Sequence, residues 1–186
     1  MKPSPSKKKA AAGPAVLRFK AKLLRQADAG KTEFGLALKL PESISREFPP
    51  DGLAQVEGTI NGHPFRAPLD ADADGGHLLR VNKAMSAGAK AEAGDTVQLA
   101  ILGPEPESKP PEDLRAALAA SPAAMTLWKQ LTPFLRRDWI RWVEGAKKAE
   151  TRARRVTRTI EQLAEGKRRA CCVNVYEYML CRVNEN

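Results

Sequence analysis

Aspartates at alternate positions are the first candidate for chemistry in this sequence. Asp70, Asp72 and Asp74, followed by Gly75, match the first half of a calcium-binding EF-hand loop. That loop also needs a bidentate glutamate at its twelfth position, which is Val81 here, and it needs helices on both sides. The flanking residues alternate in polarity as strands do. We therefore predict a polar β-turn and no metal site.

A second short pattern, Gly30-Lys31-Thr32, looks like the end of a phosphate-binding loop. The full motif has an earlier glycine at the position that Arg25 occupies here, and a helix must follow it. The residues from Phe34 onward alternate like a strand instead. This pattern favours a hairpin turn over a nucleotide site.

Histidines and cysteines could supply a base, a nucleophile or metal ligands. His63 and His77 lie next to predicted turns without an identifiable partner, so we expect surface or hydrogen-bonded histidines. Cys171, Cys172 and Cys181 are odd in number and lack a C-x-x-C spacing, so we expect reduced thiols and no zinc. The sequence thus predicts no catalytic residue, no metal and no cofactor.

Positive charge and tryptophan concentrate in one stretch, from Ser121 to Lys167. Trp139 and Trp142 share one apolar helical stripe, so we expect tryptophans to form a core rather than a base-stacking platform. The basic residues around them are our candidate binding surface for an anionic partner. Its members are Arg136, Arg137, Lys147, Arg152 and Arg155.

Alternatives to a binding surface stay open for these basic residues. They can form a solvated face that i,i+4 pairs such as Glu144–Lys148 partly neutralise. They can also dock on an acidic part of the same chain, because charge is unevenly distributed. Residues 1–25 carry +8, residues 26–122 carry −6, residues 123–169 carry +8 and residues 170–186 carry −1.

The elements that must position these residues fall into a β-rich half and a helical half. We expect a disordered basic arm over residues 1–14 and a β-barrel domain over residues 15–102. Asn61-Gly62 is the strongest hairpin signal, because a type I′ turn needs positive φ at both central positions. About six strands and one short helix at residues 83–90 favour a closed or partly closed barrel.

The helical half begins after a Pro/Glu linker at residues 103–112. Ser121-Pro122 and Thr132-Pro133 each pair an N-cap with a proline at the first helical position. We place a helical basic domain at residues 113–168 and leave the tail, residues 169–186, as either a strand or a helix. The predicted fold class is α+β, with a small barrel followed by helices.

Composition and length exclude several classes of protein. The chain has 186 residues, of which 42% are hydrophobic and 28% charged, as in ordinary soluble domains. No apolar run approaches the roughly 20 residues that span a bilayer. The basic N-terminus lacks the apolar segment of a secretory signal, so we expect a cytoplasmic protein.

Many weak matches in the same order give the chain a family resemblance. The C-terminal half resembles the YdeI/OmpD-associated, or bacteriocin-protection, family. The region before it resembles a domain of unknown function, DUF1905, that is often fused in front. The matching pieces include Trp128, Leu131-Thr132-Pro133, Arg136-Arg137, Trp139, Trp142 and Glu150-Thr151-Arg152, with Val56 to Gly62, Pro64-Phe65-Arg66 and Gly75-Gly76-His77 before them.

This resemblance implies a double-split-type barrel followed by a helical domain, with no established enzyme activity. We therefore expect a non-enzymatic, cytoplasmic binding or stress-protection protein of the bacteriocin or cationic-peptide resistance type. Its helical domain would present a basic surface to an anionic macromolecule or an acidic protein. The alternative is a DNA- or RNA-binding regulator that uses the barrel and the basic arm. The acidic balance of the barrel region counts against that alternative.

Overall fold

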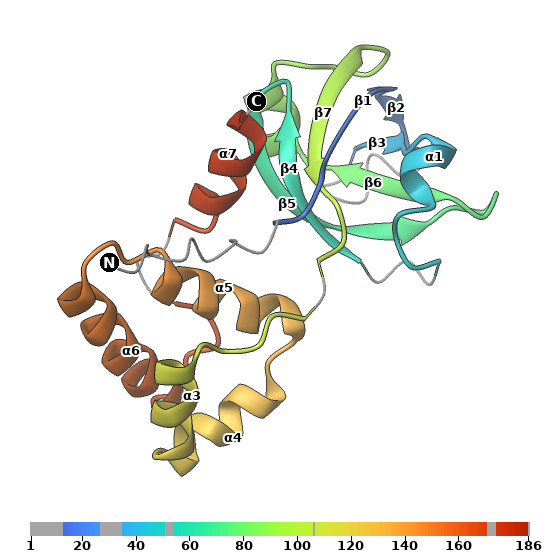
Figure 1. The fold of residues 1–186 in the computed structure, drawn as a ribbon. Coiled ribbons are helices and arrows are strands. Elements are labelled where there is room, and N and C mark those ends of the chain that lie inside the picture. The colour runs from blue at the N-terminus through green and yellow to red at the C-terminus, as the bar shows by residue number, and fades with distance from the viewer. Residues whose placement is uncertain (1–12, 27–34, 51–53, 106, 171–173, 186) are drawn as a thin grey trace, which may run out of the picture.

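A computed structural model describes residues 13–26, 35–50, 54–105, 107–170 and 174–185 (Figure 1). In it, a curled antiparallel sheet of seven strands forms an open barrel and is followed by helices. The predicted α+β class is therefore confirmed. The Gly30-Lys31-Thr32 pattern, Cys171, Cys172 and most of the predicted basic arm lie outside the described residues.

The sheet has the order β1-β7-β4-β5-β6-β3-β2, and its inner face encloses an apolar core that includes Leu38, Phe65 and Leu69. The predicted hairpin is confirmed, since Asn61 and Gly62 have φ of 48° and 82° between paired strands. Two short helices, α1 (Glu42–Ser45) and α2 (Lys83–Ala89), cover the barrel. The strands are β1 (Val16–Lys22), β2 (Leu24–Arg25), β3 (Leu36–Lys39), β4 (Gln55–Ile60), β5 (His63–Ala71), β6 (His77–Val81) and β7 (Thr96–Leu102).

The aspartates that resemble a calcium loop hold protein cations. The ammonium of Lys39 lies 2.6 Å from Asp72 and 2.7 Å from Asp74, and Asp70 accepts a 2.6 Å bond from Arg80. The hydrogen bond from Lys39 lowers the pKa of Asp72. The loop closes as a turn, in which Gly75 N–H donates to the Asp72 carbonyl at 3.0 Å. The three aspartates are thus paired with side-chain cations of the neighbouring strands.

His77 is a hydrogen-bonded residue of the barrel core and is only 2% exposed. Its Nε2 lies 2.8 Å from the Pro49 carbonyl, and its Nδ1 lies 2.6 Å from Ser45 Oγ. Because a carbonyl can only accept, Nε2 carries a proton, and in the neutral imidazole Nδ1 then accepts from the serine hydroxyl. His77 therefore ties α1 to β6, in line with the hydrogen-bonded alternative. His63 lies against Gly88 of α2, where an added Cβ would come within 2.2 Å of the imidazole.

Replacing Ser45 by alanine should lower the free energy of unfolding by about 1–3 kcal/mol, because His77 Nδ1 loses its donor inside the core. Urea unfolding measures the change. Ser86→Ala is the matched control, since its exposed hydroxyl bonds only to a carbonyl of its own helix. If both variants showed the same small loss of unfolding free energy, the buried hydrogen bond between Ser45 and His77 would not stabilise the fold.

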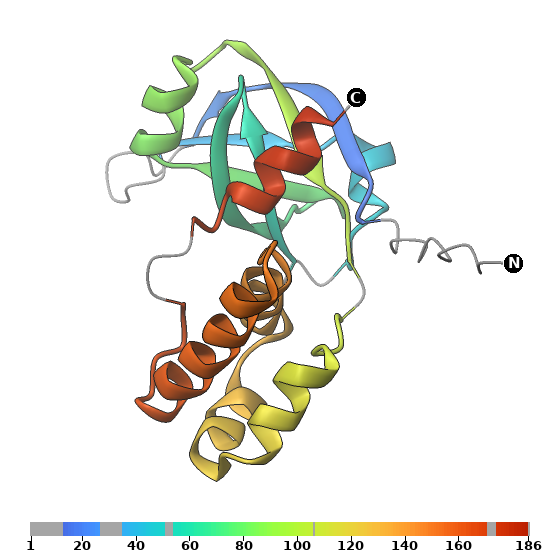
Figure 2. The same cartoon turned by 60° about the vertical axis from the view of Figure 1, so that its left-hand side comes forward.

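Helices α3 to α6 pack together as a bundle, which lies on one side of the sheet (Figures 1 and 2). Ser121 and Thr132 cap α4 and α5 through the backbone N–H groups of Ala124 and Leu135, as predicted. Trp139 is fully buried, and its ring meets that of Trp142 edge-on at 6.0 Å, which confirms the predicted tryptophan core. The bundle helices are α3 (Glu112–Ala119), α4 (Pro122–Gln130), α5 (Pro133–Glu144) and α6 (Ala149–Ala164).

The buried face of α6 differs from the apolar stripe that the 4-3-4-3 spacing of Ala149, Ala153, Val156, Ile160 and Leu163 predicts. Val156 and Leu163 are buried, but Ala149 and Ala153, the first members of the stripe, are exposed. Half-buried Arg152 and Arg155 take the inner positions of the first turns because they find partners on α3 and α5. Side-chain pairing, rather than apolar character, therefore sets the orientation of the N-terminal half of α6.

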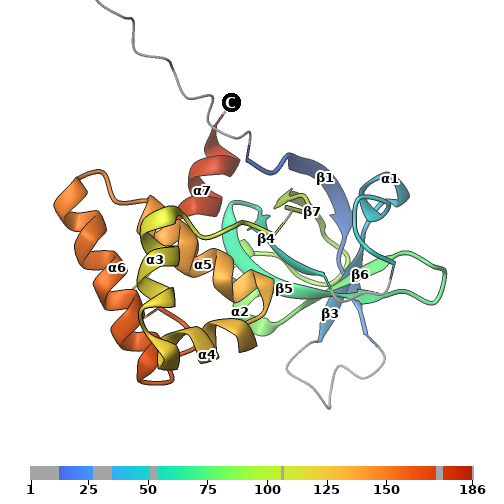
Figure 3. The same ribbon diagram turned by 60° about the horizontal axis from the view of Figure 1, so that its bottom comes forward.

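The tail ends in a further helix, α7 (Glu177–Asn184), which lies on the outside of the barrel (Figures 2 and 3). Met179 and Val183 are buried there against Ala100 and Leu102 of β7. Arg18 of β1 donates to the Val183 carbonyl at 2.6 Å. Among the described residues, no helix is long and apolar enough to cross a membrane.

Candidate functional site: an arginine cluster between barrel and helices

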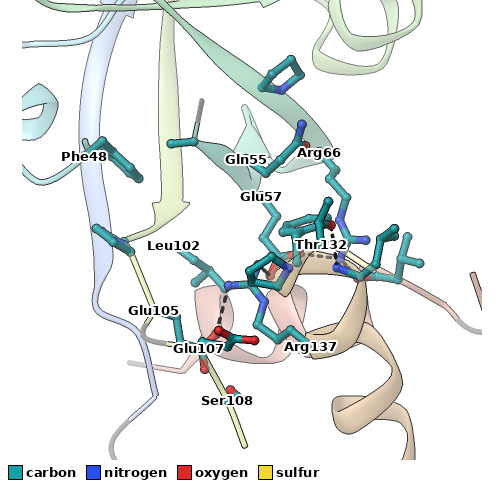
Figure 4. A pocket seen from close by; sticks show the side chains of 18 of the residues that line it. Phe48, Gln55, Glu57, Arg66, Leu102, Glu105, Glu107, Ser108, Thr132 and Arg137 are labelled. Carbon is teal, nitrogen blue, oxygen red and sulfur yellow. Dashed lines mark hydrogen bonds and ion pairs between the residues drawn. The ribbon is translucent and has the colours of Figure 1, made fainter. Parts of the chain in front are cut away.

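A cleft of about 1030 Å³ lies where the barrel meets the helical domain (Figure 4). Gln55 and Glu57 of β4 and Arg66 of β5 line its barrel side. Glu105 of the linker and Arg137 of α5 line the opposite side. The cleft therefore gathers charged groups from three separate parts of the chain.

Glu57 is the central anion of this junction and is only 2% exposed. It accepts a 2.6 Å bond from Arg66 and a second, short bond from Arg141 of α5. Burial alone would raise the pKa of Glu57, but the charges and hydrogen bonds of Arg141 and Arg66 outweigh it and hold the pKa below its usual range. Glu57 is therefore ionised at neutral pH and bridges the two domains.

Arg66 and Arg141 are well paired through their outer nitrogens. Arg66 also donates to both carboxylate oxygens of Asp138, at 2.7 Å and 3.0 Å. Arg141 also donates to Glu105 at 2.8 Å, and its guanidinium lies 3.7 Å from the centre of the Tyr178 ring. Arg66, which also donates to the Val175 carbonyl at 3.2 Å, thus joins the barrel to α5 and the tail, and Arg141 joins α5 to the barrel, the linker and the tail.

Arg137 is the least paired arginine of the cluster, although its side chain is only 15% exposed. Its single hydrogen bond among the described residues is to Glu105, at 3.2 Å, and its Nη2 lies 3.8 Å from Glu57. Burial, followed by the nearby charge of Arg141, lowers the pKa of Arg137. A partly buried cation with spare N–H groups, facing a cleft, is suited to binding an anion.

The structure disperses the five residues of the predicted binding surface. Arg137 alone lines the cleft. Arg136 binds Glu107 at 2.6 Å and two backbone carbonyls. Arg152 binds Asp113 at 2.5 Å, and Arg155 donates to the Trp142 carbonyl at 2.5 Å. Lys147 is exposed and follows the end of α5.

Docking within the chain, which the sequence left open, occurs at the junction. Arg137 and Arg141 of the helical domain face Glu57 of the barrel, and Asp138 in turn binds Arg66. The sequence prediction did not include Glu57, Arg66 or Asp138. One signal for them was present, because a two-residue turn at Asn61-Gly62 places Glu57 opposite Arg66 in the hairpin.

Comparison with known families agrees with this architecture. Residues 107–166 match the family described as Bacteriocin-protection, YdeI or OmpD-Associated. Residues 19–101 match the domain of unknown function DUF1905. No curated protein matches the chain. The resemblance seen in the sequence, to DUF1905 in the first part of the chain and to the YdeI/OmpD-associated, bacteriocin-protection family after it, is therefore confirmed.

Proposed function

We propose that this protein is a non-enzymatic, cytoplasmic binding protein of the bacteriocin-protection type. Its basic helical domain recognises an anionic group of its partner, and Arg137 in the interdomain cleft makes that contact. The observation that carries the proposal is the incomplete pairing of Arg137, which has one 3.2 Å hydrogen bond while Arg66 and Arg141 are well paired.

The pairing of the other arginines supports placing the contact in the cleft. Arg136, Arg152 and Arg155 already donate to carboxylates or backbone carbonyls within the chain. Releasing one of them to a partner would leave its internal acceptor unpaired, which opposes binding. Arg137 can bind an added anion while giving up only one long internal hydrogen bond.

The protonation chemistry of the cleft supports binding rather than catalysis. Glu57 lies between arginines that hold it ionised, so it is poorly placed to move a proton near neutral pH. Both ring nitrogens of His77 are engaged with Ser45 and Pro49 in the barrel core. Carboxylates of Glu57, Glu105 and Glu107 also line the cleft, and they would repel a nucleic-acid backbone.

Replacing Arg137 by glutamine should abolish protection in cells. Cells that express the wild-type chain should survive a bacteriocin or cationic peptide better than cells that express Arg137→Gln. Arg154→Gln is the matched control, because Arg154 is exposed on α6. Equal survival with Arg137→Gln and wild type would refute the role of the cleft. Tight binding of duplex DNA or RNA at low salt, unchanged by Arg137→Gln, would favour the regulator instead.

A further inference from the structure

We infer that the interdomain cleft binds an amphipathic organic anion, with an apolar or aromatic body and a single carboxylate bound by Arg137. This inference rests on the proposed function and specifies the ligand of the same site. It follows from the lining of the cleft, its charge balance and the way in which Arg137 is held.

The cleft has the size and lining of a small-molecule site. Its volume of about 1030 Å³ lies near the upper end of the range for such sites. Apolar and aromatic side chains from the barrel, the linker, α5 and the tail form much of its wall, with polar groups at a few points between them. They include Phe48, Pro68, Leu102, Phe134, Leu135 and Tyr176. Such a wall fits an apolar body better than a hydrated inorganic ion.

The charge balance of the cleft indicates one negative charge on the ligand. Four carboxylates lie in or beside the cleft, those of Glu57, Glu105, Glu107 and Asp138, against five guanidinium groups, those of Arg66, Arg136, Arg137, Arg141 and Arg169, which leaves one positive charge in excess. Within the described residues, the buried Nε of Arg66, Arg137 and Arg141 has no partner, but Arg137 makes the fewest bonds of the three through its other nitrogens. The carboxylates of the three glutamates that line the cleft would repel a ligand with several negative charges.

The surroundings of Arg137 allow it to change partner at small cost. Its bond to Glu105 is 3.2 Å long, whereas Arg141 holds the same carboxylate at 2.8 Å. If Arg137 turned to a ligand carboxylate, Glu105 would keep a charged donor. The Phe134 ring lies 4.8 Å from the Arg137 guanidinium and covers a face of it. The edge, with its paired N–H groups, is the part that binds a carboxylate.

Titration calorimetry with the full chain tests this inference. The probes are indole-3-acetate, its neutral analogue indole-3-acetamide, and inorganic phosphate. We expect indole-3-acetate to bind wild type and Arg154→Gln equally, and to bind Arg137→Gln at least tenfold more weakly. We expect the amide and phosphate to bind wild type at least tenfold more weakly than the acid. Tyr176→Ala should weaken the binding of indole-3-acetate several-fold, because it removes part of the apolar wall of the cleft.

Specific outcomes would overturn the inference. If indole-3-acetate and indole-3-acetamide bound equally, the site would not recognise the negative charge. If phosphate bound as tightly as indole-3-acetate, the site would not recognise the apolar body. Undetectable binding of indole-3-acetate at millimolar concentration, or equal binding to Arg137→Gln, would also overturn it. If survival still depends on Arg137 in any of these cases, the proposed function stands and only the ligand class fails.

Discussion

Replacing Glu57 by glutamine is expected to lower the free energy of unfolding by about 3–5 kcal/mol. The neutral amide keeps the shape of the side chain but no longer balances the buried charges of Arg66 and Arg141. Removing one partner of a buried ion pair is costly because the remaining charge is uncompensated. For a chain of this size, the loss corresponds to a melting temperature roughly 6–20 °C lower.

Urea unfolding of Glu57→Gln, with Glu107→Gln as control, measures this effect. Glu107 also pairs with an arginine, at 2.6 Å, but its side chain is 53% exposed, so we expect a loss of less than about 1 kcal/mol. A Glu57→Gln variant as stable as Glu107→Gln at pH 7 would contradict the bridging role of Glu57.

The same pair of proteins should show a defined pH dependence. The pKa of Glu57 is lower in the folded chain than its ordinary value of 4.5, so its stabilising contribution is complete above that value. The contribution is lost as the pH falls below 4.5 toward the folded pKa. The difference between wild type and Glu57→Gln should therefore be largest near neutral pH and shrink in acid.

Replacing Gly58 by alanine should lower the free energy of unfolding by about 3 kcal/mol, at the upper end of the usual cost of overpacking. Gly58 of β4 pairs with Ile101 of β7. A Cβ at Gly58 would lie 2.3 Å from the carbonyl oxygen of Ala100 and 2.8 Å from the Cα of Ile101. Both atoms belong to the backbone, so no side-chain rotation relieves the contact.

Gly103→Ala is the matched control for this prediction. Its added Cβ would lie 3.4 Å from the Ala15 carbonyl oxygen, an ordinary contact. The conformational entropy of the unfolded chain falls in both variants alike, because each replaces a glycine by alanine. Chemical unfolding of both variants compares the two sites. If Gly58→Ala were no less stable than Gly103→Ala, β4 and β7 would not approach as closely as described.

Local features of the fold were predictable because residues close in sequence determine them. Asn61-Gly62 forms its turn through its own backbone preference, and Thr132 caps α5 through an N–H three residues ahead. Apolar and polar residues alternate from Val16 onward, as in a half-buried strand, and form β1, while the shared stripe of Trp139 and Trp142 predicted the helical core. The two domains could therefore be outlined before their arrangement was known.

The junction could not be predicted, because it depends on contacts far apart in the sequence. Hairpin register pairs Glu57 with Arg66, but only docking brings Arg141 to the same carboxylate. Charge density likewise does not say which arginine finds an internal partner. Arg136 and Arg137 are neighbours in the chain, yet one binds the linker and backbone carbonyls while the other faces the cleft.

The unfolding free energy of Arg137→Gln without ligand tests the central claim most directly. In this variant, Glu57 and Glu105 still bind Arg141, so the loss of the Arg137 guanidinium leaves no buried carboxylate unpaired. We predict a stability equal to that of wild type or up to about 1 kcal/mol higher, because burial of Arg137 is poorly compensated. A loss of about 3 kcal/mol or more would contradict the account, because it would make Arg137 a structural ion-pair residue like its neighbours.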